Sequence, residues 1–193
     1  MKHEGNKYIG KVRKGFDGCH FGYDGEEHVK DEYKVLTCSS PWVNAEGGEV
    51  PEGSMVGGRE EDGEHIFIGR CIHEGGVHIG KVRAAFEGCL IGWGGEEIHK
   101  KFYQVLKDVE GEWVDCANGD MPDGALRCGK ESSGEDLFLA RGDFRDGVHP
   151  GKMRPGYGGL RVCHTAEEHH LDNYQVFKPL HPFPTHPWAG TWG

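Results

Sequence analysis

The sequence predicts an all-β fold of tandem, pseudosymmetric antiparallel repeats, and three observations support it. The phrase at residues 79–106, IGKVRAAFEGCLIGWGGEEIHKKFYQVL, recurs at 9–36 and, more loosely, at 150–177. A fixed period indicates that one supersecondary unit has been copied and packed against itself. Turn signals recur at intervals of roughly ten residues, which is typical of short antiparallel strands. The chain also has 33 glycines without a collagen-like triplet period, and such spacing disfavours helices.

The repeat pattern divides the chain into four parts. Residues 1–36 form an N-terminal half repeat, because HEGNKYIGK at its start matches the middle of the next copy, HEGGVHIGK. Residues 42–106 and 113–177 are two complete repeats, and residues 178–193 are a tail that contains proline and tryptophan. The two complete repeats keep a constant offset of 71 residues, as Trp42 and Trp113 illustrate.

Within each complete repeat the strand candidates follow in order. Apolar runs bounded by turn residues predict strands at 65–70 and 136–141, HIFIGR and DLFLAR. The alternating segment at 76–83, GVHIGKVR, predicts another, and the β-rich ends FYQVL and NYQVF predict the last strand of each repeat. We expect strands to be exchanged between repeats in a sandwich- or prism-like arrangement.

The tail allows two interpretations. Its Pro-Trp pair at 187–188 repeats the pair at 41–42, where a new repeat opens. The tail therefore either docks where the half repeat lacks an opening strand, on its own chain or a neighbour, or it is an extended segment held by its tryptophans.

Composition excludes several classes of function. The net charge of −10 argues against general attraction to nucleic acid. There is no run of about 20 apolar residues that would span a membrane. The N-terminus lacks the apolar region of a signal peptide, which favours a cytoplasmic protein, with release by an unconventional route left open. Seven cysteines without a C-x-x-C pair favour reduced thiols over a disulfide framework or a zinc ribbon.

Several motif positions recur in the same order in each complete repeat. They are a Trp-Val opening, a GG-x-E position (GGRE in the first repeat and CGKE in the second), an apolar strand ending in Arg, a Gly-Lys step and a Tyr-Gln-Val close. This pattern resembles the DM-nine repeat family, whose best-understood members are invertebrate lectins, over residues 2–177. The resemblance implies calcium-independent recognition of mannose-containing glycans, often by a dimer, in innate pathogen recognition.

The resemblance also implies the binding residues. In the mannose-binding members recognition depends on an acidic side chain after the glycine pair and on the lysine of the Gly-Lys step. Those positions are Glu60 with Lys81, and Glu131 with Lys152. The lectins carry aspartate at the acidic position, so the longer glutamate leaves the sugar preference open. The half repeat keeps Lys11 but no upstream acidic partner, which puts a third site in doubt.

The chemistry of such a pair suits a sugar. A carboxylate only accepts hydrogen bonds and an ammonium only donates them, so together they satisfy adjacent hydroxyls with charge-assisted bonds. One monosaccharide site is weak, and repetition on a chain or dimer supplies avidity. The alternative is a pair of exposed salt bridges worth about 0–1 kcal/mol each. We expect Lys81→Ala or Lys152→Ala to lower the affinity for glycans while leaving the fold intact.

Other motifs are less convincing as sites. The pairs Glu26–Glu27, Glu96–Glu97 and Glu167–Glu168 resemble glycosidase carboxylates, but neighbours on a strand point to opposite faces. We expect turn carboxylates, one of each pair bonding backbone amides. The run at 164–170, HTAEEHH, resembles a metalloprotease motif that requires a helix, whereas its counterparts predict turn and strand. Adventitious nickel or zinc binding by the 13 histidines is the better expectation, so no metal, cofactor or catalytic residue is predicted.

Recurrent aromatic and basic positions are assigned to structure. Three aromatic sets are expected to lie in the core, whereas Tyr23 and Trp93 either pack or stack on a sugar. Cys19 and Cys89 share a position with Leu160, so we expect buried, apolar thiols. Arg70 and Arg141 are expected to pair with carboxylates. The core sets are Phe16/Phe86/Tyr157, Tyr33/Tyr103/Tyr174 and Trp42/Trp113.

The predicted function is a non-enzymatic, calcium-independent lectin for mannose-type glycans, including microbial surface polysaccharide, acting as a homodimer or higher oligomer. The alternative is an oligomeric scaffold or adaptor that binds protein partners through its repeat faces and tail. Deleting residues 180–193 abolishes assembly in that case, without necessarily abolishing sugar binding. A carbohydrate-processing enzyme requires two carboxylates facing one pocket. The exact sugar, the number of occupied sites and the oligomeric state stay open.

Overall fold

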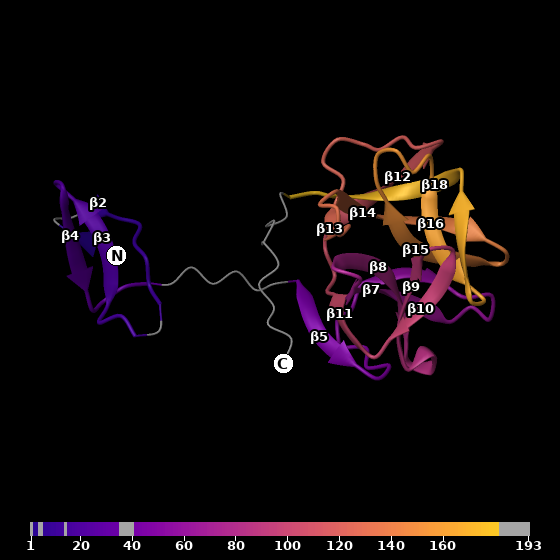
Figure 1. Ribbon diagram of the computed structural model, residues 1–193, viewed down its shortest axis with the longest axis horizontal. Coiled ribbons are helices and arrows are strands. Elements are labelled where there is room, and N and C mark those ends of the chain that lie inside the picture. The colour runs from indigo at the N-terminus through magenta and orange to yellow at the C-terminus, as the bar shows by residue number, and fades with distance from the viewer. Residues whose placement is uncertain (1, 4–5, 14, 35–40, 182–193) are drawn as a thin grey trace. The chain divides into compact units, whose positions relative to one another are not determined.

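The computed structural model describes residues 2–3, 6–13, 15–34 and 41–181, which fall into two compact units, Met1–Ser39 and Ser40–Gly193. The described residues form an almost entirely β structure, with one 3₁₀ turn at Ala84–Phe86 (Figure 1). This confirms the all-β prediction. Among these residues no helix is long and apolar enough to cross a membrane. The predicted tail docking concerns residues 182–193, which lie outside the described part.

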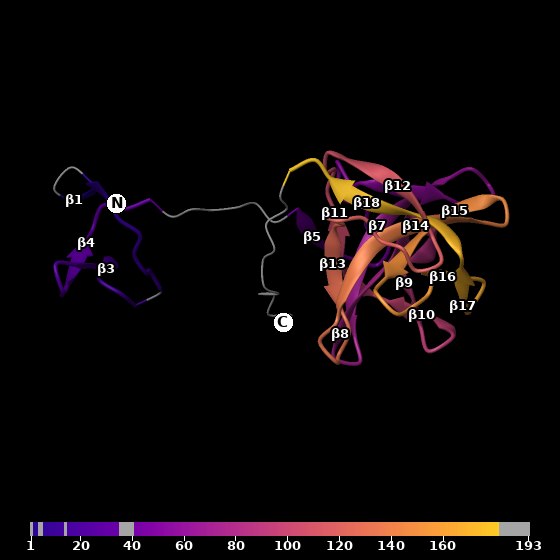
Figure 2. The same cartoon turned by 90° about the horizontal axis from the view of Figure 1, so that it is seen from above.

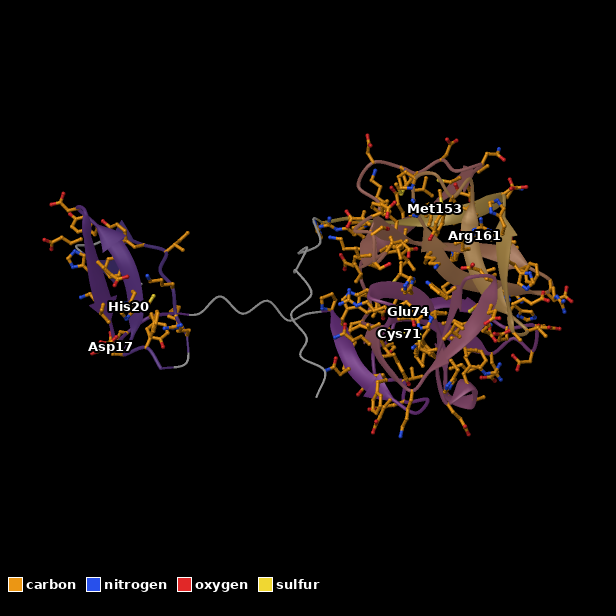
Figure 3. The ribbon with its side chains drawn as sticks, viewed as in Figure 1. Asp17, His20, Cys71, Glu74, Met153 and Arg161 are labelled. Atoms are coloured by element: carbon orange, nitrogen blue, oxygen red, sulfur yellow. The ribbon has the colours of Figure 1, made fainter. Side chains whose placement is uncertain are left out.

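The first unit contains two small antiparallel hairpins. Strands β1 (Lys2–His3) and β2 (Asn6–Lys7) form one, and β3 (Cys19–Tyr23) and β4 (Glu26–Lys30) form the other. An isolated antiparallel bridge pairs Lys11 with His20 of β3. His20 lies beside Asp17 (Figure 3), with its Nε2 2.8 Å from a carboxylate oxygen.

The second unit is one antiparallel sheet of fourteen strands in which each strand of residues 42–106 has a counterpart in residues 111–179. The strands of the first complete repeat are β5 (Trp42–Glu46), β6 (Val56–Arg59), β7 (His65–His73), β8 (Gly76–Arg83), β9 (Gly88–Trp93), β10 (Glu96–Lys100) and β11 (Phe102–Leu106). Those of the second are β12 (Gly111–Ala117), β13 (Arg127–Lys130), β14 (Asp136–Phe144), β15 (Gly147–Met153), β16 (Leu160–His164), β17 (Glu167–Leu171) and β18 (Asn173–Pro179).

The strand pairings confirm the predicted pseudosymmetric exchange. Strand β6 adds to β15 of the other repeat, and its counterpart β13 adds to β8. Every other pairing likewise has its counterpart, and β10 pairs with its own counterpart β17 at the centre. In Figures 1 and 2 the purple-to-magenta strands of one repeat therefore interlock with the orange-to-yellow strands of the other. Neither repeat completes its sheet alone.

The core follows the same symmetry. One cluster joins the repeats through residues such as Ile68, Ile79 and Leu139. A second cluster lies within the first repeat and includes Cys89, and a third lies within the second and includes Leu160. The buried Cys89 thiol confirms the apolar role expected for this position, and burial raises its pKa well above the usual range. Six described cysteines are free thiols.

The glycine of each Gly-Lys step has a packing reason. A Cβ on Gly80 would lie 2.1 Å from the backbone oxygen of Leu90, and one on Gly151 would lie 2.0 Å from that of Arg161. No side chain fits such an approach, so the neighbouring strand sits close behind each following lysine.

Among the described residues, the two arginines contact a glutamine and a tryptophan where a carboxylate was expected. Arg70 donates to the Gln104 side-chain oxygen at 2.8 and 3.0 Å and lies over the Trp42 ring at 4.0 Å. Arg141 repeats this with Gln175 at 2.9 Å and Trp113 at 4.1 Å. The amide oxygen and the indole face take the place expected for a carboxylate, because the strand that closes each repeat presents a glutamine opposite the guanidinium.

Candidate functional site

The two glutamates implied by the sequence begin matching turns. Glu60 follows β6, and its backbone N–H donates to the Glu64 carbonyl at 3.0 Å, while Gly63 donates back to Glu60 at 2.9 Å. Glu131 follows β13 with the same two bonds, from Glu131 to Glu135 at 2.8 Å and from Gly134 at 3.0 Å. Gly63 and Gly134 have positive φ values of 83° and 103°, which glycine adopts readily. The turn fixes where each carboxylate projects.

The structure brings Glu60 and Lys81 into direct contact. Lys81 lies in the middle of β8 and its Nζ donates to Glu60 Oε1 at 3.0 Å. Its side chain is only 3% exposed and that of Glu60 10%, so this is a buried pair rather than the exposed salt bridge considered above. The Glu60 carboxylate, an acceptor, and the Lys81 ammonium, a donor, therefore meet from a turn and a strand of the same repeat.

Glu131 and Lys152 form the counterpart, with a looser ion pair. Lys152 Nζ lies 3.8 Å from Glu131 Oε1 and 3.4 Å from His78 Nδ1, to which it can donate. The Tyr157 hydroxyl donates to Glu131 Oε1. In the first repeat Phe86 occupies the place of Tyr157, with its ring centroid 5.2 Å from Lys81 Nζ. Both rings are partly buried and border the charged groups. Tyr157 also packs against the core, as predicted, whereas Phe86 is not part of a core cluster.

A third charged residue completes each cluster and was not predicted as part of it. Glu97 Oε2 lies 3.7 Å from Lys81 Nζ, and Glu168 Oε1 lies 3.6 Å from Lys152 Nζ. Their other oxygens accept backbone N–H groups from the opposite repeat, of Ala166 at 3.4 Å and Gly95 at 3.3 Å. The prediction that one glutamate of each pair bonds backbone amides is therefore confirmed for Glu96–Glu97 and Glu167–Glu168, whereas Glu27 of the first pair faces the side chains of Lys11 and His20. The recurrence of Glu-Glu was the signal for this residue.

Histidines from the opposite repeat close the clusters, and sequence reasoning missed them. His149 on β15 and His164 at the end of β16 place their Nδ1 atoms 4.0 and 3.8 Å from the Glu60 carboxylate. His78, the counterpart of His149, lies 4.0 Å from Glu131. The counterpart of His164 is Trp93. The two clusters therefore carry similar charges but differ in one neighbouring residue, which is His164 at the first cluster and its counterpart Trp93 at the second.

Burial keeps the inner imidazoles neutral. It lowers the pKa of His78 to about 4, with further lowering by Lys152 that Glu131 opposes. It lowers the pKa of His149 to about 4 as well, assisted by Lys81 and opposed by Glu60. A neutral imidazole offers one donor and one acceptor, so it adds a two-way hydrogen-bonding group beside the ions.

The first cluster opens onto the surface. A shallow hollow of about 690 Å³ is lined by Glu60, Lys81 and Glu97, together with Phe86 and His164. That volume accommodates a small polar ligand. The predicted residues are therefore accessible from solvent even though their side chains are mostly covered.

In the first unit the third lysine finds a different partner. Lys11 Nζ lies 2.8 Å from Glu27, the counterpart of Glu97 and Glu168, and both side chains are more than half exposed. This pair reproduces the contact of Lys81 with Glu97 and of Lys152 with Glu168, but on the surface instead of in a buried cluster.

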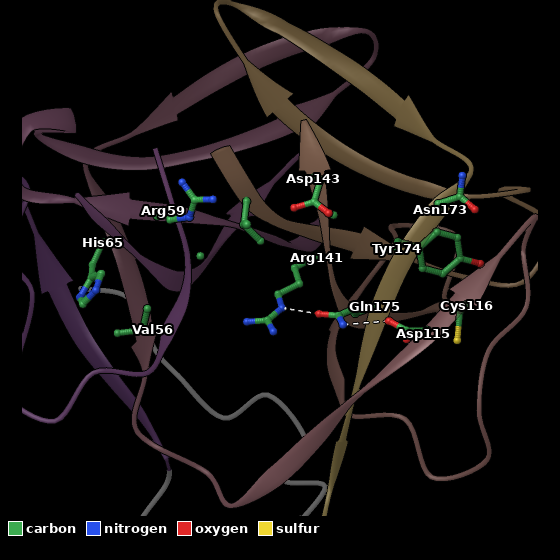
Figure 4. A pocket seen from close by; sticks show the side chains of 13 residues that line it. Val56, Arg59, His65, Asp115, Cys116, Arg141, Asp143, Asn173, Tyr174 and Gln175 are labelled. Carbon is green, nitrogen blue, oxygen red and sulfur yellow. Dashed lines mark hydrogen bonds between the residues drawn. The ribbon is translucent and has the colours of Figure 1, made fainter. Parts of the chain in front are cut away.

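A separate cleft of about 580 Å³ lies elsewhere in the second unit (Figure 4). Two consecutive side-chain hydrogen bonds lie in this cleft, which together form a relay. Arg141 donates to Gln175 at 2.9 Å, and Gln175 donates to Asp115 at 2.9 Å. The first repeat carries the same relay from Arg70 through Gln104 to Asn44. A network present in both repeats is best explained as sheet structure, and none of the predicted binding residues line this cleft.

The histidine-rich run at 164–170 forms a hairpin. His164 ends β16, Thr165 and Ala166 make the turn with φ values of 53° and 67°, and β17 follows. The turn-and-strand prediction is confirmed, and the helix that a metalloprotease motif requires is replaced by a strand pair.

Comparison with known proteins decides the family. The sequence matches the DM9 repeat over residues 1–100 and 85–171. The chain belongs to the DM9 repeat family. The sequence-based resemblance is therefore confirmed. No curated protein matches the chain.

Among solved structures, this DM9 protein is similar to the nematode sperm cell motility protein MFP2B. The TM-score is 0.52 at 12% identity, over 88% of this chain and 62% of that one. The chain thus spans less than two thirds of MFP2B. At this identity the likeness shows a shared fold, which agrees with the pseudosymmetric sheet described above.

Proposed function

We propose that this DM9 protein is a non-enzymatic lectin that binds mannose-type glycans at the Glu60/Lys81 and Glu131/Lys152 clusters. The observation that carries the proposal is the convergence of an acceptor-only carboxylate and a donor-only ammonium, 3.0 Å apart at Glu60 and Lys81, in a shallow hollow. Adjacent hydroxyls of a pyranose can bond both at once. Microbial surface polysaccharide, met in innate recognition, is the glycan source that we propose.

The second carboxylate supports binding over a purely structural ion pair. Lys81 faces both Glu60 and Glu97, and Lys152 faces both Glu131 and Glu168. Each cluster therefore has more acceptor capacity than its single ammonium satisfies, and Glu97 Oε2 and Glu168 Oε1 are buried with no hydrogen bond among the described residues. Sugar hydroxyls are donors that meet this need.

Burial decides which substitution tests the proposal. Removing Lys81 leaves two carboxylates facing each other out of water, which is strongly destabilising. Glu60→Gln and Glu131→Gln keep the size and one acceptor while removing the charge. A mannose and oligomannose titration of the wild-type chain, both single variants and the double variant tests the proposal, with circular dichroism as the check on folding.

Two exposed glutamates next to the clusters provide matched controls. Glu96 directly precedes Glu97 on β10, and Glu167 directly precedes Glu168 on β17. Glu96→Gln and Glu167→Gln should bind as the wild-type chain does. Binding that is unchanged in the folded Glu60→Gln/Glu131→Gln double variant would eliminate the site.

The second candidate is a scaffold or adaptor that binds protein partners. The observation in its favour is the fold shared with MFP2B, a protein named for sperm cell motility. Measuring the molecular mass of the full chain and of a chain lacking residues 180–193 distinguishes the two. Loss of assembly with intact sugar binding assigns the tail to oligomerisation, and absence of sugar binding in the full chain favours the scaffold.

A further inference from the structure

The two charged clusters of the second unit differ in one respect that the repeat pattern does not predict. At the first cluster, Glu60, His149 and His164 each place a ligand-type atom within 4.8 Å of the others, and all three residues are buried. At the second cluster Trp93 stands where His164 would be. An indole has no lone pair to offer a metal, since its nitrogen only donates. Any metal chemistry is therefore confined to the first cluster.

The imidazole nitrogens that face Glu60 have no partner of their own. His149 is 0% exposed and His164 7%. The Nδ1 atoms of both are buried and make no hydrogen bond within the described part of the chain. Buried polar atoms are rarely left unsatisfied, so two in one place, both directed at a carboxylate, point to an occupant.

We infer that Glu60, His149 and His164 form a site for one divalent transition-metal ion of the zinc type. Two imidazoles and one carboxylate are a known ligand set for Zn²⁺, which leaves a fourth position open. This inference replaces the sequence-based expectation of no metal, and it does not depend on the proposed sugar binding.

The distances are compatible with metal binding after small side-chain movements. Ligand atoms around a tetrahedral zinc ion lie roughly 3.4 Å apart, given bonds of about 2.1 Å. The Nδ1 atoms of His149 and His164 lie 4.0 and 3.8 Å from oxygens of Glu60. Closing each gap requires a shift of about 0.5 Å, which rotation of the carboxylate and the rings supplies.

The surrounding groups favour a cation in spite of Lys81. Lys81 donates to Glu60 Oε1, the oxygen that His149 also faces, whereas His164 faces the other oxygen, Oε2. Glu97 also neutralises Lys81 from the other side at 3.7 Å. The outer nitrogen of His164 lies 3.7 Å from Glu61, and a small approach would give the carboxylate–histidine hydrogen bond that orients metal-bound histidines in proteins. Four carboxylates and two cations line this hollow, so the carboxylates are in excess; they are Glu60, Glu61, Asp62 and Glu97 against Lys81 and Arg83.

The test is a calorimetric titration of the untagged full chain with zinc chloride. We expect one saturable site per chain in the wild type. His149→Gln and His164→Gln should each weaken zinc binding by about 100-fold or more, because loss of supporting residues alone costs about 10- to 100-fold. Circular dichroism confirms that each variant is folded, and His164→Trp, which copies the other repeat, is a second variant if His164→Gln fails to fold.

The chain supplies its own controls. His169→Gln/His170→Gln removes histidines of the same run that lie outside the cluster, and His78→Gln alters the matching position in the other cluster. Both should keep the site. Trp93→His should add a second zinc ion beside His78 and Glu131. Absence of saturable binding in the wild type, or a site that persists in folded His164→Gln, overturns the inference.

Glu60 belongs to both proposals, and substitution of Lys81 separates them. Lys81→Met removes the ammonium on which sugar binding depends but no metal ligand. Because this change also leaves Glu60 and Glu97 without their cation, circular dichroism first establishes that the variant is folded, and Lys81→Gln, which keeps a hydrogen-bond donor, replaces it if Lys81→Met does not fold. If zinc binding is correct, this variant retains or strengthens it whether or not the chain binds sugar. A folded Lys81→Met chain that loses zinc contradicts the inference.

Discussion

Each lysine of the Gly-Lys steps in the second unit is a buried cation between two carboxylates. Lys81 and Lys152 are 2% and 3% exposed. Each faces one glutamate from the turn after β6 or β13 and a second glutamate from β10 or β17 of the same repeat. A buried charge is tolerated only when it is paired and hydrogen-bonded. These residues therefore contribute to the fold and to the proposed site together, and a substitution affects both.

The first prediction at the residue scale concerns Trp93, for which packing and sugar stacking were both considered. Trp93 is 38% exposed and meets His73 edge-on at 4.9 Å, and His73 in turn contacts His78 of the Glu131 cluster. Trp93→Ala should weaken glycan binding at that cluster by about tenfold, since ring stacking contributes about 1 kcal/mol or more. Titration in a Glu60→Gln background, where only this cluster is intact, measures the effect. An unchanged affinity there would assign Trp93 to packing alone.

At the scale of single elements, β8 and β15 carry the site because their neighbours approach so closely. Gly80 and Gly151 leave no room for a side chain next to β9 and β16. Each strand can therefore be pressed between two others, which covers the following lysine from water. The site is thus a consequence of how tightly these strands pair.

Gly80→Ala should destabilise the second unit. The added Cβ would meet a backbone oxygen at 2.1 Å, and overpacking of this kind costs about 1–3 kcal/mol or more. Guanidinium denaturation measures the change. Gly22→Ala, at a position with nothing within 4 Å of the added carbon, should be nearly neutral. A Gly80→Ala chain as stable as the wild type would contradict the close approach.

The buried imidazoles on β8 and β15 predict a pH dependence of stability. The pKa of His78 and that of His149 are lowered to about 4 in the folded chain, against about 6.5 when unfolded. Between these values the unfolded state binds more protons, so the free energy of unfolding falls as the pH drops from about 6.5 to 4. Thermal unfolding in a chelator-containing buffer measures this.

His78→Gln should flatten that dependence, because one of the two titrating groups is gone. His65→Gln, at an exposed histidine of β7, should leave the slope as it is. If stability depended on pH equally in the wild type and in His78→Gln, the pKa of His78 would have to be the same in the folded and unfolded states.

At the scale of the whole molecule, the pseudosymmetric sheet makes two complete clusters per chain. The half repeat contributes Lys11 and Glu27, which are both more than half exposed, whereas Lys81 and Lys152 are buried. We therefore expect two sugar sites per chain rather than three. Lys11→Ala should leave the stoichiometry and affinity of mannose binding unchanged in calorimetry. A third site that disappears in Lys11→Ala would show that another segment completes the half repeat.

Much of this architecture could be predicted from the sequence. The offset of 71 residues between Glu60 and Glu131, and between Lys81 and Lys152, reveals the repeats and their recurrent charged residues. Period-two alternation and turn residues specify short strands, because both depend on neighbours in the chain. The partner residues within each repeat, Glu with Lys, lie close enough in sequence for the same pattern to identify them.

Only the tertiary structure decided what surrounds those pairs. Reciprocal exchange of β6 and β13 places His149 and His164 beside Glu60, and His78 beside Glu131. No local pattern encodes this, because the histidines lie about ninety residues or more along the chain from Glu60 and which strand edges pair depends on packing of the whole sheet. The burial that turns Lys81 and Lys152 into shielded ions, and the placement of His164 beside Glu60, follow from that pairing.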